Sequence, residues 1–206
     1  LNWLVKFAMP LLVPSLKKAD FAAAQNVDVF IANSSEVQAR IKKYYKKNST
    51  VVHPPVSTER FTPARTRDNY YVALGRQVPY KRFDLAIKAA TKLNLPLKVY
   101  GSGSEHARLK AMAGKSVSFY SDRHGNASDI AVTAALNHAK GFLFPVEEDF
   151  GIVQVEALAA GAPVIAYNKG GAQDIVQTGE SGVLFDHQTV DSLVAAIQRA
   201  EDIQFF

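Results

Sequence analysis

Strand-like and helix-like runs alternate along most of this chain, and this alternation limits its fold more than any other feature does. Short strand-like runs, such as 97–100 and 117–120, are followed by longer runs of helical character. The pattern is typical of a parallel sheet whose strands are joined by crossover helices. We therefore predict an α/β fold: a Rossmann-like parallel sheet with helices on both faces.

The same runs give the expected elements. Strands are expected at Val27–Ala32, Thr50–Val52, Tyr70–Leu74, Leu97–Tyr100, Val117–Tyr120, Phe142–Phe144, Val164–Ala166 and Val183–Phe185. Helices are expected at Ser34–Lys46, Phe83–Lys92, Glu105–Met112, Asp129–Ala139, Ile152–Ala160, Ala172–Thr178 and Val190–Ala200. Asn33 to Glu36 resemble a capped helix start, and Gly161 and Gly179 suit helix ends.

The composition is that of an ordinary globular protein. The chain has 206 residues, 48% of them hydrophobic, which is enough for one sizeable core and part of a second. It has no cysteine, so a disulfide scaffold and a thiolate metal site are excluded. The five histidines are too scattered to form a metal site, and none is predicted. A net charge of +5 suits phosphate-bearing ligands, and no nucleic-acid-binding signature is present.

The first sixteen residues are strongly apolar, but we do not expect them to be a signal peptide. Lys6 interrupts the apolar run, and we expect Pro10 and Pro14 to break it. The run lacks the basic start and cleavage site of a signal peptide, and it is shorter than the ~20 apolar residues that span a bilayer. We interpret it as an internal part of a longer protein.

A domain boundary is expected near residue 56. His53-Pro54-Pro55-Val56 contains two prolines, which fix an extended backbone, and a polar stretch, 57–69, follows. We therefore divide the chain into residues 1–56 and 57–206.

A pair of carboxylates frames the start of a predicted helix. Glu148 and Glu156 lie eight residues apart, and Phe150-Gly151 lies between an apolar strand-like run and the helix. The first N–H groups of that helix would be free to bind an anion, and the carboxylates could accept from hydroxyls. A sugar nucleotide offers both a pyrophosphate and hydroxyls. The alternative is a surface loop followed by a helix with a solvated Glu.

A basic pair follows another predicted strand. Arg76 and Lys81 lie five residues apart, across a loop and at a helix start, where both could contact one phosphate group. Each such charge-assisted contact is worth roughly 1.5–3 kcal/mol. The alternative is a surface loop with two solvated cations.

The carboxylate run resembles the Glu-x7-Glu signature of retaining glycosyltransferases of family 4, which have the GT-B fold. The resemblance continues through Ala157–Ala166 and covers the chain from about Val27 to Ala200. It implies that residues 57–206 are the C-terminal, nucleotide-sugar-binding half of a GT-B fold. Residues 1–56 would be the tail of the N-terminal acceptor domain, although Ser57 stands where the family usually has Asp.

The resemblance also implies roles for individual residues. Glu148 would lie at the donor sugar and Glu156 at the nucleotide ribose, while Arg76 and Lys81 would hold the diphosphate. We therefore expect Glu148, Arg76 and Lys81 to be catalytic. The residues expected to bind the nucleotide sugar are Gly75, Gly101, Gly103, Phe150, Gly151, Ile152, Val153 and Glu156.

Two further segments match the family less closely. Gly170-Gly171 resembles a Gly-Gly turn of the family and is expected to be a tight turn more than a ligand contact. The family has Gly where Tyr120 or Ser121 falls, and the following segment around His124 is irregular. No base is therefore assigned from this region.

A basic and aromatic cluster, Lys42–Lys47, lies at the end of a predicted helix. Cations complement the helix dipole there, so a solvated face is expected. Peripheral contact with a membrane is the alternative. The expected location is the cytoplasm, and peripheral contact would place the protein at the inner face of the membrane.

Taken together, the resemblance implies retaining transfer of a hexosyl group from a sugar nucleotide to a polysaccharide or lipid-linked glycan acceptor. The expected donor is GDP- or UDP-linked, with GDP-mannose favoured, and no cofactor or metal is expected. The acceptor site and the family's catalytic His would belong to the missing N-terminal domain, so this chain alone is expected to be inactive. The alternatives are a sugar-nucleotide-binding module without activity and a GT-B relative such as an epimerase.

Overall fold

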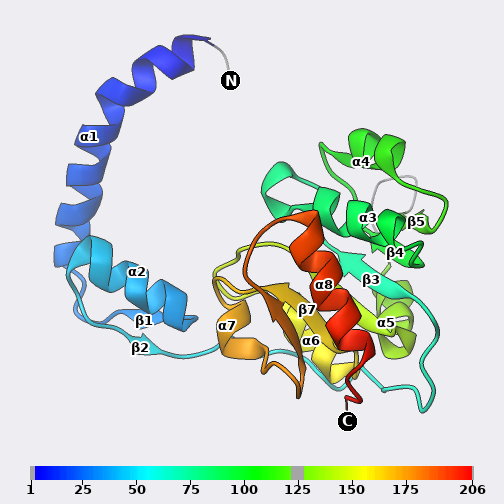
Figure 1. Ribbon diagram of the computed structural model, residues 1–206. Coiled ribbons are helices and arrows are strands. Elements are labelled where there is room, and N and C mark those ends of the chain that lie inside the picture. Colours follow the sequence, from blue (N-terminus) through cyan, green and yellow to red (C-terminus); the bar gives the residue numbers. More distant parts are fainter. Residues whose placement is uncertain (1–2, 122–127, 206) are drawn as a thin grey trace. The chain divides into compact units, whose positions relative to one another are not determined.

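A computed structural model describes residues 3–121 and 128–205 of the chain. These residues fold into two compact units, Leu1–His53 and Pro54–Phe206 (Figure 1). The irregular segment expected around His124 lies outside the described residues.

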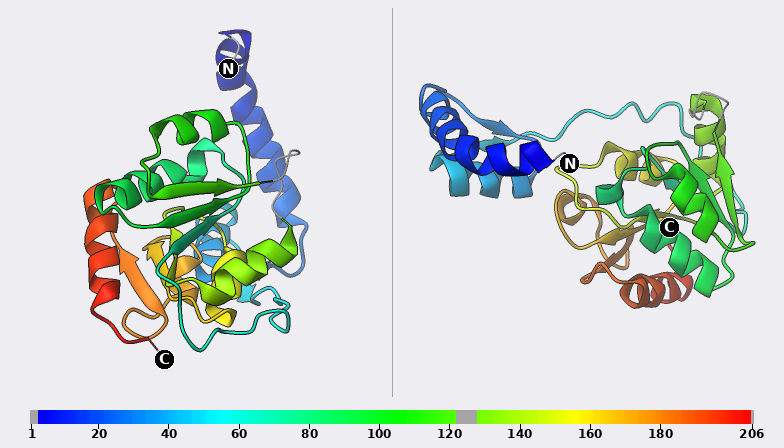
Figure 2. Two further views of the ribbon diagram at one scale, coloured as in Figure 1. Left: turned by 90° about the vertical axis from the view of Figure 1, so that its right-hand side faces the viewer. Right: turned by 90° about the horizontal axis from the view of Figure 1, so that it is seen from above.

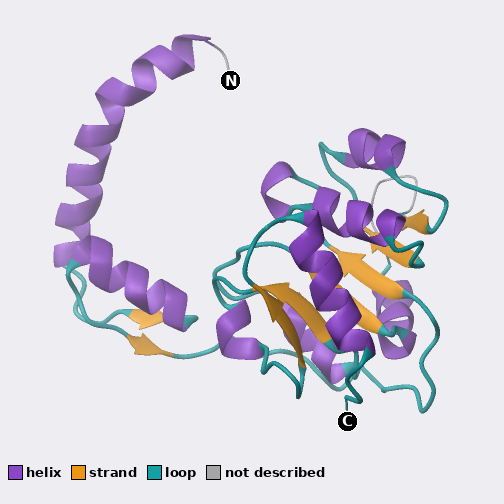
Figure 3. Ribbon diagram, viewed as in Figure 1, coloured by secondary structure: helices purple, strands orange, loops and turns teal. Residues whose placement is uncertain are grey.

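The C-terminal unit is built on a six-stranded parallel sheet with the strand order β5-β4-β3-β6-β7-β8 (Figure 3). Its strands are β3 (Tyr71–Leu74), β4 (Leu97–Tyr100), β5 (Val117–Tyr120), β6 (Gly141–Phe144), β7 (Val164–Tyr167) and β8 (Gly182–Phe185). Each lies within a residue of its predicted bounds. The predicted α/β fold with a parallel sheet is confirmed.

Helices cover both faces of this sheet (Figure 2). They are α3 (Phe83–Lys92), α4 (His106–Met112), α5 (Asp129–His138), α6 (Ile152–Ala159), α7 (Ala172–Ile175) and α8 (Val190–Glu201), with a short 3₁₀ turn, η1 (Pro79–Lys81), before α3. The predicted helix from Ala172 to Thr178 ends early because Val176 is extended, with φ −100° and ψ 116°.

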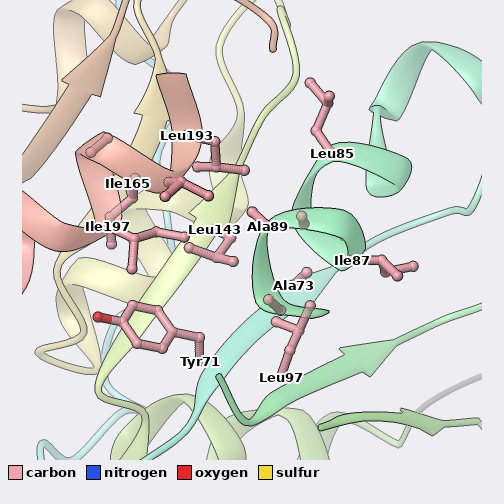
Figure 4. Packing of buried hydrophobic residues seen from close by; sticks show 14 of the residues in the cluster. Tyr71, Ala73, Leu85, Ile87, Ala89, Leu97, Leu143, Ile165, Leu193 and Ile197 are labelled. Atoms are coloured by element: carbon pink, nitrogen blue, oxygen red, sulfur yellow. The ribbon is translucent and has the colours of Figure 1, made fainter. Parts of the chain in front are cut away.

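Side chains of successive strand residues point to opposite faces and fill two cores. Tyr71 and Ala73 face α3 and α8, whereas Val72 between them faces the side of α5 and α6. Figure 4 shows the first core, in which Leu143 and Ile165 of the sheet pack with residues of α8 and α3. Each such buried aliphatic side chain stabilises the fold by about 1.5–3 kcal/mol. This burial on both faces explains why β6, β7 and β8 are short and apolar, whereas β4 and β5 carry Lys98 and Ser118.

The strand order places a switch point beside β3. Tyr71 of β3 pairs with Leu97 of β4 on one side and with Gly141 of β6 on the other. The chain therefore leaves β3 toward one edge of the sheet and later returns to fill the other. In open parallel sheets, ligands bind in the crevice at the carboxyl ends of the strands at such a point.

The N-terminal unit is smaller. It comprises α1 (Trp3–Gln25), α2 (Ser35–Tyr45) and a parallel pair of two-residue strands, β1 (Ile31–Ala32) and β2 (Thr50–Val51). The Ser34 side chain caps α2 by accepting from the Val37 N–H at 3.2 Å. Asp20 of α1 accepts from the Tyr45 hydroxyl at 2.9 Å and joins the two helices. The strand predicted at Val27–Ala32 is shorter because 27–30 form an irregular connection.

The expectation that Pro10 and Pro14 break the first segment was wrong, since α1 continues through both. The two prolines lie about one turn apart, and each lacks the N–H that the helix needs. Prolines bend a helix rather than ending it when the flanking residues keep their bonds, and α1 is visibly curved in Figure 1. Within residues 3–121 and 128–205, no helix combines the length and apolar character that crossing a membrane requires.

Candidate functional site

The loop after β3 carries the predicted basic pair and is tied to the loop after β4. The buried Gln77 side chain donates to the Gly101 carbonyl at 2.7 Å, and its backbone N–H donates to the Ser102 carbonyl at 2.7 Å. The Gln77 Oε1 lies 2.8 Å from Nδ1 of His106, which therefore carries the proton and donates. Sequence reasoning missed Gln77, because nothing in the sequence shows that this polar residue is buried.

The glycines after β4 are required by the neighbouring loop. Gly101 has φ +97°, and a Cβ on it would lie 2.4 Å from the Gly75 carbonyl oxygen. A Cβ on Gly103 would lie 2.3 Å from the Gln77 carbonyl oxygen. Both contacts are closer than a Cβ allows, so the two loops can pack together only with glycine here. At both positions the backbone of the loop after β4 lies against the backbone of the loop after β3.

A second glycine turn supports the loop that carries Glu148. The Gly171 N–H donates to the Glu148 carbonyl at 2.8 Å. Gly170 has φ +66°, and a Cβ on it would lie 2.2 Å from that same carbonyl oxygen. The Gly170-Gly171 pair is therefore a close turn against this loop. Phe150, two residues after Glu148, is buried, with 7% of its surface exposed.

Gly151 is the N-cap of helix α6, and its φ of +86° turns the chain into the helix. The Gln154 N–H donates back to the Gly151 carbonyl at 2.9 Å. Ile152 and Val153 begin the first turn of α6, where the backbone N–H groups have no hydrogen-bond partner within the helix. Glu156 follows in the second turn with its side chain 17% exposed.

Two ion pairs join the basic and acidic parts of the site. Lys81 Nζ contacts Glu148 Oε1, so two residues predicted to be catalytic meet directly. Arg60 Nη2 donates to Glu156 Oε1 at 2.5 Å. Arg60 was missed in the sequence because it lies in the polar segment after the prolines, far from any motif.

A pocket of about 570 Å³ opens at this edge of the sheet. It is lined by Arg60, Leu74, Gly75, Arg76, Gly101, Ser102, Gly103, Asp129, Val132 and Glu156. Five of the predicted residues are thus brought together: Gly75, Arg76, Gly101, Gly103 and Glu156. Lys81, Glu148, Phe150, Gly151, Ile152 and Val153 are not among the lining residues.

Asp129 is, after Arg60, the second charged pocket residue that sequence reasoning did not identify as functional. It is the first residue of α5, after the cap at Ser128, whose side chain accepts from the Ala131 N–H at 3.2 Å. The carboxylate therefore lies at the helix N-terminus, where negative charge is favourable. The pocket combines cations, glycine-rich backbone and two carboxylates.

A tyrosine cluster supports the sheet near the pocket. Burial raises the pKa of the Tyr70 hydroxyl to about 12 and also raises the pKa of the Tyr100 hydroxyl. The rings of Tyr100 and Tyr120 stack at 5.1 Å, and Lys98 Nζ lies 3.4 Å from the centre of the Tyr70 ring. The hydroxyls of Tyr70 and Tyr100 stay neutral near pH 7, so they contribute packing rather than acid–base chemistry.

Among the residues that the structure describes, no group of three or more His, Asp or Glu side chains is arranged to hold a metal ion. The positive charges near the pocket come from arginine and lysine. A parallel sheet with a pocket at its switch point, lined by two arginines, two carboxylates and glycine-rich backbone, defines a class of α/β proteins with a candidate ligand site at the carboxyl ends of the strands.

The chain belongs to the family of glycosyl transferases group 1, whose family model matches residues 56–204. It is 28% identical to the GDP-mannose-dependent alpha-(1-6)-phosphatidylinositol monomannoside mannosyltransferase of Mycolicibacterium smegmatis, over 90% of this chain and 56% of that protein. It is 29% identical to a D-inositol 3-phosphate glycosyltransferase of Geodermatophilus obscurus, over 83% of this chain and 45% of that protein. The chain thus spans about half the length of these curated relatives.

Solved structures show the same fold. Sucrose-phosphate synthase from Thermosynechococcus elongatus superimposes with a TM-score of 0.80 and 24% identity, over 92% of this chain and 53% of that one. The Anabaena protein HepE in complex with UDP-glucose gives a TM-score of 0.75 and 19% identity, over 90% of this chain and 57% of that one. The predicted resemblance to family 4 glycosyltransferases of the GT-B fold is confirmed.

Proposed function

We propose that residues 57–206 bind the sugar nucleotide for a retaining glycosyltransferase that transfers a hexosyl group to a polysaccharide or lipid-linked glycan. The observation that carries this proposal is the pocket at the switch point, which combines Arg76, the glycine loops and Glu156. A nucleoside diphosphate offers the matching groups: an anion for Arg76 and ribose hydroxyls for Glu156.

The leaving diphosphate is neutralised by protein groups in this proposal. Arg76 and Lys81 bind it, together with the free N–H groups at the start of α6. Negative charge grows on the diphosphate as the sugar departs, so these contacts strengthen in the transition state and lower the barrier. The reaction then needs neither metal nor cofactor.

The sugar itself is assigned to Glu148. Its carboxylate pairs with Lys81 in this structure, and this contact supports a sugar-binding role for Glu148 beside the diphosphate-binding role proposed for Lys81. The glycosidic bond to be broken joins those same two parts of the donor. An acceptor hydroxyl held on the side of the departing diphosphate would give retention at the anomeric carbon.

GDP-mannose is the proposed donor. The name of the relative from Mycolicibacterium smegmatis includes GDP-mannose dependence, which supports this choice. Asp129 supports it independently, because a carboxylate accepts hydrogen bonds only and guanine presents two adjacent donors on its base-pairing edge. Uracil presents one donor on the corresponding edge.

The acceptor is proposed to bind through an N-terminal domain of which residues 1–56 form the tail. The chain matches only about half of its relatives' length, which supports an additional domain. Positioning of two reactants supplies ~7–11 kcal/mol of a barrier, so the present chain alone should not transfer sugar. We place the enzyme in the cytoplasm at the inner membrane face, with Lys42–Lys47, whose Lys42, Lys43 and Lys46 are exposed, as a peripheral contact.

Calorimetry tests the binding part of the proposal. The chain should bind GDP, and GDP-mannose more tightly, in the presence of a chelator. Strict dependence on Mg²⁺ would contradict the metal-free mechanism, and failure to bind any nucleoside diphosphate would contradict the proposed function.

Two alternatives are separated by product analysis. With labelled GDP-mannose and a lipid-linked acceptor, we expect no glycosylated lipid and at most slow hydrolysis of the donor, which is how a pure binding module would also behave. Restoring the N-terminal domain should then restore transfer. An epimerase-type relative would instead convert the sugar nucleotide without any acceptor.

A further inference from the structure

Arg60 holds one oxygen of the carboxylate that the proposed function assigns to ribose. Its Nη2 donates to Glu156 Oε1 at 2.5 Å, and both residues line the pocket. The two residues are separated by 96 positions in the sequence. The contact therefore exists only through the fold, and it has no counterpart in the roles assigned so far.

The segment that carries Arg60 is fixed from both sides. Phe61, the next residue, is buried in the core beside α5, and its N–H closes a turn onto the Thr58 carbonyl at 3.0 Å. The Thr62 N–H donates to the Asn137 side chain at 3.1 Å, close to the end of α5. The guanidinium of Arg60 also lies 4.8 Å from the centre of the Phe61 ring. These contacts hold the guanidinium in place before a ligand arrives.

Arg67 strengthens the same anchorage. Its guanidinium donates to the carbonyls of Asn137, Ala139 and Ala160 at 3.1–3.3 Å, which ties this segment to the ends of α5 and α6. Burial lowers the pKa of Arg67. The segment that carries Arg60 is thus held to the end of α5 and to the end of α6, the helix that carries Glu156.

The geometry leaves one carboxylate oxygen for a ligand. An ionised carboxylate accepts through both of its oxygens. Arg60 occupies Oε1, and within the described part of the chain no hydrogen bond to Glu156 Oε2 is found. A ligand that enters the pocket meets an oriented acceptor rather than a freely rotating side chain.

We propose that Arg60 is a positioning residue that orients Glu156 so that its second oxygen accepts from the ribose hydroxyls, which makes the pocket selective for ribonucleotides. The inference rests on the proposed function, because it takes a nucleoside diphosphate as the ligand. Arg60 would act through Glu156 and would not itself contact the phosphates.

The test compares GDP with 2′,3′-dideoxy-GDP by calorimetry on the full chain. The unaltered protein should bind GDP at least about tenfold more tightly, which is the factor that one ordinary hydrogen bond supplies. Arg60→Ala should weaken GDP binding about tenfold and leave dideoxy-GDP binding nearly unchanged. Arg60→Lys, which keeps a cation but loses the fork of donors, should retain part of the selectivity.

Controls separate the possible failures. Arg65→Ala removes an exposed arginine from the same segment and should alter neither affinity. A thermal unfolding midpoint close to that of the unaltered chain would show that Arg60→Ala still folds; should it not fold, Arg60→Lys carries the test. Combining Arg60→Ala with Glu156→Ala should add little to the effect of Glu156→Ala alone, as expected for residues that act as a unit.

Three results would overturn the inference. Equal losses for GDP and dideoxy-GDP would make Arg60 a phosphate contact, and unchanged selectivity in a folded Arg60→Ala protein would give it no role in ribose recognition. In either case GDP still binds the unaltered chain and the proposed function stands. If the unaltered chain binds neither nucleotide, the proposed function itself fails, and this inference fails with it.

Discussion

The pocket edge of the sheet has two halves with opposite chemistry. The loops after β3 and β4 supply Arg76, Lys81 and three glycines, whereas the connections after β6 and β7 supply Glu148, Glu156 and the Gly170-Gly171 turn. In each half, glycines let one loop approach the backbone of its neighbour, and each half also supplies charged side chains. The difference is the sign of the charge.

This difference suits a ligand that is anionic in one part and rich in hydroxyls in another. Cations bind phosphate through charge-assisted bonds, while carboxylates accept from hydroxyls. The Lys81–Glu148 and Arg60–Glu156 pairs bring the two kinds of charge together in the structure. Each pair is partly exposed, so its value is expected to lie in orientation more than in stability.

The largest effect is expected from adding a methyl group to the glycine of either half. Gly101→Ala and Gly170→Ala would place a Cβ 2.4 and 2.2 Å from a carbonyl oxygen, at positive φ. Strain and overpacking together should cost about 2–5 kcal/mol of unfolding free energy, measured by urea denaturation.

Gly179→Ala is the matched control for this prediction. Gly179 also has positive φ, +90°, but no heavy atom lies within 4 Å of its added Cβ. It should lose only the conformational part, about 1–2 kcal/mol. Equal losses at all three positions would show that loop packing does not require glycine in either half.

Removing the Arg76 cation from the basic half should weaken the binding of every nucleoside diphosphate by a similar amount. Arg76→Ala is expected to cost about 1.5–3 kcal/mol of binding free energy for both GDP and GDP-mannose, measured by calorimetry, because the diphosphate is common to both. Lys88→Ala removes an exposed cation from α3 and should change neither. Undiminished GDP binding by Arg76→Ala would remove this residue from the diphosphate site.

Substitutions of the two carboxylates in the acidic half should affect the binding of different ligands. Glu156→Ala should weaken the binding of both GDP and GDP-mannose by about 1–3 kcal/mol, because contacts to the ribose are lost. Glu148→Ala should leave GDP affinity nearly unchanged and weaken GDP-mannose, because its assigned contact is the sugar. Calorimetry on both variants with both ligands decides this, and equal effects on GDP would contradict the assigned roles.

The smallest effect is expected at Asp129, which belongs to neither half. Asp129→Ala should reduce the preference for GDP over UDP by about 1 kcal/mol, since one acceptor for guanine is lost. Asp129→Asn, which keeps one oxygen, should reduce it less. Competition binding measures the ratio directly, and a ratio that is unchanged in both variants would refute guanine recognition by this residue.

The sequence predicted the local features of the site well. The short strand-like runs predicted the strand positions because strands that are buried on both faces of a sheet are short and largely apolar. Charged and glycine residues that directly follow such strands had to lie at one edge of the sheet. The pocket accordingly contains Gly75, Arg76, Gly101 and Gly103, and Glu156 joins them from the second turn of α6.

Contacts between distant segments could not be predicted in this way. Gln77 and His106 are 29 residues apart, Lys81 and Glu148 are 67 apart, and Arg60 and Glu156 are 96 apart. The sequence holds no local signal for such a pair. Pro10 and Pro14 illustrate the converse, since a strong local signal for a break was overridden and the helix continued.

The sequence by itself determined the class of fold, the positions of the strands and the residues at the strand ends, because periodicity and loop position are local properties of the chain. The tertiary structure alone decided which of those residues meet and at which positions a neighbouring loop leaves room only for glycine. The physical reason is that side-chain pairing and backbone clearance depend on distances across the sheet. Arg60 beside Glu156 and Gly170 against Glu148 exist only once the strands have been placed side by side.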